Sequence, residues 1–360
     1  MTEGVKNWYG NIVMKAIIKK DPASGFHRGE VKMPEIGPKE ILVKIRAAGI
    51  CGTDLHIYDW DESISRRMNL PRVIGHEITG EVATVGDGVT RVKVGDAISA
   101  ESHIVCGKCL QCRRGDFHIC QKTLILGIDV DGGFAEYVKI PEENAWKVRD
   151  EHTGQPLPLE VSAVLEPFGN AVHAVLADEI TGKSMAIFGC GPIGLFAIGI
   201  AKASGATALF AIETKEYRRR LAEKMGATRV FNPEKERVVE EIQKLTHKEG
   251  VDIVLDMSGH PDAIHQGFKV LTPGGRFTAF GLPSKPLPID LSQEIIFKGI
   301  KVLGIIGRRL PETWHKTFSL VETGLLDIRP IITHKFPMDR FEEAFQLIKS
   351  GECGKVVLIP

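Results

Sequence analysis

Four cysteines lie close together in this chain of 360 residues, in the pattern C-x2-C-x2-C-x7-C. They are Cys106, Cys109, Cys112 and Cys120. Such tight spacing can bring four thiolates to one point, and tetrahedral zinc accepts four of them at about 2.3 Å. Four protein ligands leave no open coordination position, so the pattern predicts a structural zinc. An iron–sulfur cluster or a redox site, which use similar spacings, is the alternative.

A second metal site is indicated by Cys51, in GICGTDLH, and His76, in GHE. A single buried cysteine or histidine is more often a core residue than a ligand, but the two together suggest a metal. Catalytic zinc takes three protein ligands and keeps an exchangeable fourth position. The third ligand has to come from elsewhere, and the carboxylates of Glu77 and Glu166 are both available.

A dinucleotide site is predicted at Gly189-x-Gly191-x-x-Gly194, because this motif follows an apolar strand and opens an apolar helix. Glu213 ends the next strand about twenty residues on, where a carboxylate can bind a ribose 2′-hydroxyl and would repel a 2′-phosphate. The sequence therefore favours NAD over NADP. Glu213 could instead be a solvated strand end, and Arg218 could face the adenosine or be a surface cation.

Two different sequence patterns predict the strands and helices that position these residues. From Met14 to about Ile140, short β-type runs are separated by glycines, which predicts an all-β unit. From about Lys183, strands and helices alternate, as in a parallel sheet with helices on both faces. We expect strands over 14–20, 41–50, 78–86, 91–100, 134–140, 184–189, 208–213, 229–232, 251–259, 274–281, 301–307 and 355–360, and helices over 192–206, 215–227, 234–247, 261–271, 314–323 and 340–350.

Charge and hydropathy exclude other classes of protein. The chain has 46 Lys and Arg against 46 Asp and Glu, a net charge of zero, which argues against nucleic-acid binding. The longest uncharged stretch, 185–201, is interrupted by glycines and is too short to span a bilayer, so no membrane segment is expected. The amino terminus does not look like a secretory signal. A reducing cytoplasm is therefore the expected compartment.

Together, GICGTDLH, GHE, the four-cysteine lobe and GCGPIG resemble the zinc-dependent medium-chain alcohol dehydrogenases over nearly the whole chain from Met14 onward. The resemblance implies a GroES-like β-rich catalytic domain over residues 1–168 and 311–360. It also implies a Rossmann NAD-binding domain over 169–310. Residues 1–13 match nothing in the family pattern.

The resemblance also implies roles for particular residues. One of two zinc ions per subunit would be catalytic, held by Cys51, His76 and Glu77, with Glu166 coordinating at some stage or serving the proton path. The structural zinc would be held by the four clustered cysteines. Thr53 and His56 would relay a proton, and His103 would contact the substrate or, alternatively, only buttress the cysteine lobe. The dinucleotide contacts would be Gly189, Gly191, Ile193, Gly194, Glu213, Arg218, Phe280, Gly281, Leu282, Ile305 and Ile306.

Within the family, the fragments ESHIVCGKC, CGTDLHIYDW, LEPFGNAVHA, GIIGR and IITHKF resemble the members that oxidise L-threonine at its 3-hydroxyl with NAD. We therefore expect oxidation to L-2-amino-3-oxobutanoate, in threonine catabolism. A polyol dehydrogenase of sorbitol or butanediol type is the nearest alternative, and a non-catalytic NAD-binding structural protein is an alternative from another class. The family resemblance also suggests a homotetramer, in which the strand near 301–307 could extend a sheet between subunits.

Overall fold

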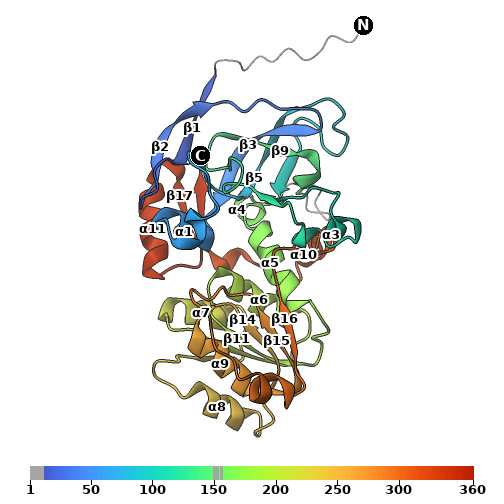
Figure 1. Ribbon diagram of the computed structural model, residues 1–360, viewed down its shortest axis with the longest axis vertical. Helices are drawn as coiled ribbons and strands as arrows, with labels where there is room; N and C mark the ends of the chain where they lie inside the picture. Colours follow the sequence, from blue (N-terminus) through green and yellow to red (C-terminus); the bar gives the residue numbers. More distant parts are fainter. Residues whose placement is uncertain (1–11, 149–153, 155–156) are drawn as a thin grey trace. The chain divides into compact units, whose positions relative to one another are not determined.

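The computed structural model describes residues 12–148, 154 and 157–360, which divide into two compact units (Figure 1). The first unit comprises Met1–Glu166, Lys335–Phe345 and Val356–Pro360, and the second comprises Pro167–His334 and Gln346–Lys355. Residues 1–11, where we expect no secretory signal, lie outside the described part. Among the described residues, no helix is both long enough and apolar enough to cross a bilayer.

The first unit is built on β-sheets. Its largest sheet has the strand order β10-β6-β5-β3-β18-β17, with β9 pairing to β3. The strands of this sheet are β3 (Glu40–Gly49), β5 (Glu77–Val85), β6 (Ala97–Ala100), β9 (Tyr137–Pro141), β10 (Ala145–Lys147), β17 (Ile332–Pro337) and β18 (Lys355–Ile359). A second sheet has the order β2-β1-β4, from β1 (Val13–Lys19), β2 (His27–Lys32) and β4 (Arg72–Val73). The short strands β7 (His103–Ile104) and β8 (Leu124–Ile125) form a third.

Helices interrupt these strands, so the prediction of an all-β unit is wrong in detail, although the unit is β-rich. They are α1 (Gly52–Asp59), α2 (Glu62–Ser65), α3 (Leu110–Arg113), α4 (Leu159–Ser162), the start of α5 (Leu165–Val175) and the first half of α11 (Phe341–Ser350). The helix α1 begins directly after Cys51, where the Asp54 carboxylate accepts a hydrogen bond from the Cys51 amide at 2.8 Å. This reciprocal cap starts a helix of eight residues without a regular apolar stripe.

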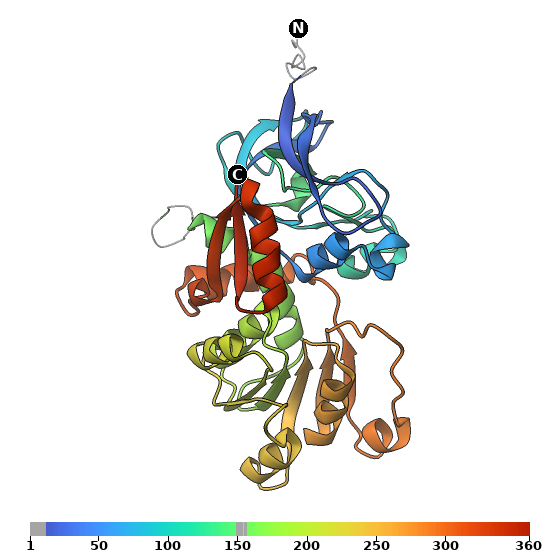
Figure 2. The same cartoon turned by 90° about the vertical axis from the view of Figure 1, so that its left-hand side faces the viewer.

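The second unit contains a six-stranded sheet in which every pair of neighbouring strands is parallel (Figure 2). Its order is β13-β12-β11-β14-β15-β16, from β11 (Ser184–Phe188), β12 (Ala208–Ile212), β13 (Arg229–Phe231), β14 (Val251–Asp256), β15 (Leu271–Ala279) and β16 (Lys301–Gly304). When the strands are numbered along the chain, the order is 3-2-1-4-5-6, which is the Rossmann order. Strands are added to one side of β11 first and then, from β14 onward, to its other side.

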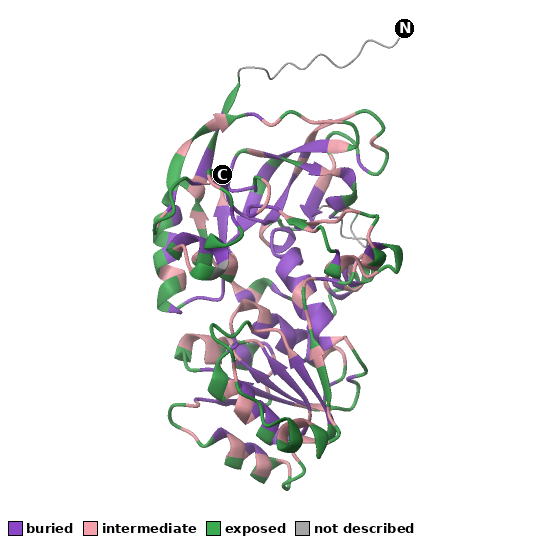
Figure 3. Ribbon diagram, viewed as in Figure 1, coloured by how far each residue is buried: buried purple, intermediate pink, exposed green. Residues whose placement is uncertain are grey.

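Helices cover the parallel sheet, and its strands β11, β12 and β14 are almost entirely buried (Figure 3). The helices α6 (Pro192–Ala203), α7 (Glu216–Lys224) and α9 (Pro261–Val270) contact its strands, and α8 (Val238–Leu245) packs on α9. The same unit contains α10 (Glu312–Glu322). One core cluster joins α8 and α9 to the sheet through Phe188, Phe231, Ile242 and Phe268. Burial on both faces explains why these strands appear in the sequence as continuous apolar runs.

Several predicted elements differ from the structure at their ends, and two of them show a clear physical reason. The strand expected over 91–100 begins only at Ala97, because Gly95 has a φ of +89° and the Lys93 amide bonds the Asp96 carboxylate at 2.9 Å, which closes a turn. The helix expected over 234–247 begins at Val238, because Glu236 bonds the Asn232 amide and holds the preceding segment as a turn.

The division into units differs from the predicted domain boundaries. Residues 311–334 lie in the second unit, whereas the sequence predicted a return to the first domain at residue 311. The reason is packing: the short 3-10 helix Arg329–Ile331 contacts α6 and α7 of the parallel-sheet unit. At the other boundary the structure changes units after Glu166, two residues before the predicted position.

Candidate active site and zinc lobe

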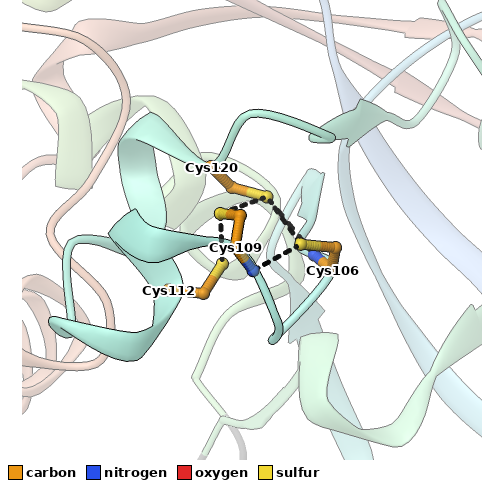
Figure 4. Close-up of side chains that lie close together, drawn as sticks. All are labelled: Cys106, Cys109, Cys112 and Cys120. Carbon is orange, nitrogen blue, oxygen red and sulfur yellow. Dashed lines mark hydrogen bonds between the residues drawn. The ribbon is translucent and has the colours of Figure 1, made fainter.

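The four clustered cysteines converge around one point (Figure 4). Their Sγ atoms are 3.5 Å apart for Cys109 and Cys112, 3.9 Å for Cys109 and Cys120, and 3.5 Å for Cys120 and Cys106. A tetrahedron of sulfurs around zinc has edges of about 3.8 Å when the Zn–S distance is about 2.3 Å. The residues therefore fit a closed, four-thiolate zinc site.

Backbone amides also stabilise these sulfurs as thiolates. The amides of Lys108 and Cys109 both donate to the Cys106 sulfur at 3.4 Å, and the Lys122 amide donates to the Cys120 sulfur at 3.4 Å. Amide donors from Cys112 and Gln121 lower the pKa of Cys109 to about 6, whereas burial raises the pKa of Cys112 to about 12. A bound cation would offset the penalty that burial places on the Cys112 thiolate, since zinc binds cysteine as the thiolate.

Cys51, His76 and Glu77 form a second convergent group in the first unit, with ligand atoms within 4.8 Å of one another. Cys51 precedes α1, His76 lies just before β5, and Glu77 is the first residue of β5. His76 is 6% exposed and Glu77 is fully buried. A partly buried thiol with a buried imidazole and a buried carboxylate at this separation has the donor types of a catalytic zinc site.

The electrostatics of this group favour a cation. Burial lowers the pKa of His76, but the Asp54 carboxylate and the Cys51 thiol outweigh burial and raise that pKa to about 10. The Asp54 carboxylate lies 3.6 Å from the His76 Nδ1 and is itself buried. The same negative potential that favours a proton on His76 would favour a divalent cation among these residues.

Thr53 and His56 lie on α1, immediately after Cys51. The Thr53 hydroxyl oxygen is 3.7 Å from the Cys51 sulfur. His56 is farther from this group and its side chain is 62% exposed, with its Nδ1 bonded to the Asp61 carboxylate. One of the two side chains therefore contacts the candidate metal ligands and the other contacts solvent.

A third group contains Glu101, His103 and Glu166, whose ligand atoms also lie within 4.8 Å of one another. Glu166 is buried, and its charge raises the pKa of His76, so this group lies near the candidate catalytic metal site. Ser102, which lies between Glu101 and His103 in the chain, donates a hydrogen bond to Glu166 at 2.5 Å. The structure brings Glu166 and His103 together in the first unit.

The glycine motif of the second unit forms the turn between β11 and α6. Gly189 has a φ of +92°, which a residue with a side chain rarely adopts. A Cβ on Gly194 would lie 2.0 Å from the Gly189 carbonyl oxygen, so helix and strand could not approach this closely with any other residue. A Cβ on Gly191 would meet nothing within 4 Å. Gly189 and Gly191 line a cavity of about 580 Å³ at the carboxyl ends of the strands.

Glu213 and Arg218 line the same cavity. The Glu213 carboxylate accepts hydrogen bonds from the amides of Cys190 and Lys215, each at 2.9 Å. It is therefore held at the glycine turn and is not a solvated strand end. The Arg218 Nε donates to the Cys353 carbonyl oxygen at 3.2 Å, which anchors this cation beside the cavity.

The other predicted dinucleotide residues lie outside the residues that line this cavity. Ile193 is in the first turn of α6. Phe280, Gly281 and Leu282 follow β15, and Leu282 is 91% exposed. Ile305 and Ile306 follow β16, where the Ile305 amide bonds the Ala279 carbonyl at 3.0 Å. Among the described residues, only Gly189, Gly191, Glu213 and Arg218 of the predicted set line this cavity.

Two family matches cover most of the described chain. Residues 37–150 match the alcohol dehydrogenase GroES-like domain, and residues 192–323 match the zinc-binding dehydrogenase family. The chain is 50% identical over 349 residues to an L-threonine 3-dehydrogenase of Caldanaerobacter subterraneus, covering 97% of this chain and 99% of that relative. The chain belongs to the zinc-dependent medium-chain alcohol dehydrogenases.

Solved structures of this dehydrogenase family have the same fold. An alcohol dehydrogenase from Escherichia coli CFT073 in complex with NADH superposes with a TM-score of 0.88 at 26% identity, covering 97% of this chain and 99% of that one. A 2R,3R-butanediol dehydrogenase from Bacillus subtilis superposes with a TM-score of 0.86 at 31% identity, covering 96% and 99%. The predicted fold class, oxidoreductase activity, zinc and dinucleotide cofactor are thereby confirmed for this dehydrogenase.

Several residues that line the cavity of the second unit were not predicted from the sequence. Met257, Ser258, His260 and Gln266 line it, from the loop after β14 and from α9. Asp256 holds that loop, because its carboxylate accepts bonds from the Ser258 hydroxyl at 2.7 Å and from the Gly259 amide at 3.2 Å. The sequence signal was the DMSG that ends a buried strand, since neighbouring parallel strands end at the same edge of a sheet.

Proposed function

We propose that this dehydrogenase oxidises L-threonine at its 3-hydroxyl with NAD⁺, giving L-2-amino-3-oxobutanoate, NADH and a proton. The observation that carries the proposal is the 50% identity to an L-threonine 3-dehydrogenase over almost the full length of both chains. The butanediol dehydrogenase is a more distant relative at 31% identity. A non-catalytic role is disfavoured because a scaffold has no use for the buried group Cys51, His76 and Glu77.

In this proposal Cys51, His76 and Glu77 hold the catalytic zinc, and Glu166 lies adjacent to it. Zinc supplies a Lewis acid that lowers the pKa of a bound hydroxyl by several units. Cys51 and Glu77 contribute the negative charge that binds the cation. Asp54 orients His76, since its carboxylate faces the Nδ1 at 3.6 Å and so favours Nε2 as the ligand atom.

The substrate proton has to reach water as hydride passes to NAD⁺. We assign this relay to Thr53 and His56. Thr53 lies beside the Cys51 sulfur, and a hydroxyl can accept one proton while donating another. The His56 side chain is exposed, and histidine side chains serve as proton shuttles in proteins, so His56 can release the proton to solvent.

We assign dinucleotide binding to the glycine turn and to Glu213, whose carboxylate would bind the adenosine ribose. Ile193, Arg218, Phe280, Gly281, Leu282, Ile305 and Ile306 are the further proposed contacts. His103 is the proposed substrate contact. The observation that supports the nucleotide site is the cavity at the carboxyl ends of β11 and β12, next to the amino terminus of α6.

We also propose a homotetramer in the cytoplasm. None of the seven cysteines, all of which the structure describes, forms a disulfide, and a reducing compartment would keep the zinc-binding cysteines reduced. The strand β16 is at one end of the parallel sheet and exposes Val302, with Ile306 exposed just beyond it. An exposed apolar edge strand is suited to pairing with a second copy of the chain.

A substrate panel tests the proposed activity. Purified protein with NAD⁺ is assayed against L-threonine, sorbitol and 2,3-butanediol at the absorbance band of NADH, with zinc measured on the same sample. We expect the highest kcat/KM for L-threonine and two zinc ions per chain. Preferential turnover of a polyol would support the alternative dehydrogenase. The matched variant Cys51→Ser should lose turnover and one zinc, and it should keep the zinc of the four-cysteine lobe.

A further inference from the structure

Three consecutive residues, Glu101, Ser102 and His103, connect β6 to β7 and are held from several sides. Glu101 is 2% exposed. Its Oε1 is 2.8 Å from the backbone nitrogen of His103 and 3.0 Å from the Nδ1 of the same residue. One carboxylate oxygen therefore accepts from both the main chain and the ring of His103. This fixes the direction in which the imidazole points.

The backbone of this segment is fixed by Asn144. The Asn144 side-chain amide donates to the Glu101 carbonyl at 2.8 Å and to the His103 carbonyl at 2.9 Å. The Glu101 amide donates in return to the Asn144 carbonyl at 2.8 Å. Both ends of the three-residue segment are thus bound to one buried side chain, so the geometry of the Glu101 and His103 pair does not depend on solvent.

Ser102 links the same segment to Glu166, which lies near the candidate metal site. Its hydroxyl donates to the Glu166 carboxylate at 2.5 Å and lies 3.4 Å from the Nδ1 of His103. The Glu166 charge acts on His76. The His103 side chain is 14% exposed, whereas that of Glu101 is 2% exposed. His103 is therefore the member of the pair that a bound molecule can reach.

We propose that Glu101 is a positioning residue, which holds His103 with its proton on Nδ1 so that Nε2 accepts a hydrogen bond from the ammonium group of the amino-acid substrate. This inference rests on the proposed function. A carboxylate can only accept, so the Nδ1 that faces it carries the hydrogen, and the Nε2 of the neutral ring is then an acceptor. An amino acid offers a charged ammonium donor, whereas a polyol offers only neutral hydroxyl donors, so the pair would favour the amino acid.

A double-mutant cycle tests this assignment in the zinc- and NAD-loaded enzyme. The variants are Glu101→Gln, His103→Ala and the two combined, with Glu143→Gln as the control because Glu143 is an exposed glutamate beside Asn144. We expect Glu101→Gln to raise the KM for L-threonine roughly tenfold, the size of coupling seen between contacting residues, with kcat much less changed. The KM for NAD and the zinc content should stay at the wild-type values.

In the His103→Ala background, Glu101→Gln should change the KM for L-threonine less than twofold, because Glu101 acts through His103. Effects that multiply independently, or a Glu101→Gln enzyme indistinguishable from Glu143→Gln, would overturn the proposal. Turnover of L-threonine by the wild-type enzyme tests the proposed function separately, since the cycle reads only differences between variants.

A measurement without substrate covers the case in which Glu101→Gln fails to fold. Histidine labelled with ¹⁵N gives separate ring signals for the two neutral tautomers, and the His103 signal is identified by its loss in His103→Ala. We expect the tautomer protonated at Nδ1 in the wild-type holoenzyme. A ring protonated at Nε2 alone would contradict the role of Glu101 whatever the substrate of the enzyme is.

Discussion

The Glu213 carboxylate is the one side chain on which we expect the choice of dinucleotide to depend. It ends β12 and is held at the glycine turn by the amides of Cys190 and Lys215. A carboxylate in this place can accept from a ribose 2′-hydroxyl and repels a 2′-phosphate. Arg218, anchored to the Cys353 carbonyl, is the cation that would gain influence if that charge were removed.

We therefore predict that Glu213→Ala lowers the ratio of kcat/KM for NAD to kcat/KM for NADP by about tenfold or more, since hydrogen bonds to charged groups contribute about 1.5–3 kcal/mol. Steady-state kinetics with both dinucleotides measure this ratio. Glu216→Ala, at an exposed position in the first turn of α7, is the control and should leave it unchanged. An unaltered preference in Glu213→Ala would refute the ribose contact.

We expect alanine substitutions at Gly191 and Gly194, two glycines of the turn between β11 and α6, to have different effects on stability and on dinucleotide binding. A Cβ at residue 194 would clash with the Gly189 carbonyl, whereas a Cβ at residue 191 would enter open space. Gly191→Ala should leave the free energy of unfolding of the enzyme without dinucleotide nearly unchanged, and it should weaken NADH binding because the methyl group occupies space beside the cavity. Gly194→Ala should lower the free energy of unfolding by about 1–3 kcal/mol, as overpacking does.

Denaturant unfolding and NADH fluorescence titration measure the two effects on the same preparations. The prediction for the turn is wrong if Gly194→Ala is as stable as the wild-type enzyme. It is equally wrong if Gly191→Ala binds NADH normally.

Glu142, in the segment before β10, holds the turn at Thr90 and Arg91 by hydrogen bonds. Its carboxylate accepts from the two backbone amides at 2.7 and 2.9 Å, and these bonds lower the pKa of Glu142. Because the folded-state pKa lies below the ordinary value of about 4.3, the ionised carboxylate stabilises the fold above that pH. This stabilisation is lost as the pH falls through the folded-state pKa.

Glu142→Gln should therefore cost about 1–2 kcal/mol of unfolding free energy at pH 7, and the difference from wild type should shrink below about pH 4. Denaturant unfolding at several pH values measures this difference. Glu143→Gln, its exposed neighbour, provides the comparison and should have little effect at any pH. A Glu142→Gln deficit that stayed constant down to pH 3 would show that the charge is not the cause.

At the scale of the whole molecule, the two proposed zinc sites differ in donor set and should differ in how readily they lose metal. Four thiolates form a closed site with backbone amides on the sulfurs. The group of Cys51, His76 and Glu77 would supply one sulfur and would leave a coordination position open on a bound zinc. A harder ligand set binds zinc less selectively and exchanges with cobalt or manganese more readily.

Mild chelation should accordingly remove one zinc per chain and abolish turnover, while the second zinc and the circular dichroism spectrum remain. Metal analysis, activity and far-ultraviolet circular dichroism on the same samples follow the order of loss. Parallel release of both metals would show that the sites do not differ in this way. Restoration of turnover by added zinc or cobalt would identify the labile site as the catalytic one.

The features that are local in the chain follow from the amino-acid sequence. The cysteine spacing places four thiolates within one short lobe, and the glycine motif specifies its own turn, since Gly189 needs a positive φ and Gly194 needs a close approach of backbone. Alternation of apolar strands and amphipathic helices specified the parallel sheet, because burial on both faces leaves strands that are apolar throughout.

The contacts between residues far apart in the chain depend on how the folded elements pack. Glu166 is 115 positions after Cys51, and no periodicity relates it to Ser102, which bonds it. Glu101 and Asn144 were not predicted, because buried polar networks join residues by packing of separate strands and leave no repeat in the sequence. The place of residues 311–334 in the parallel-sheet unit was decided in the same way, by contacts of the segment around Ile331 with α6 and α7.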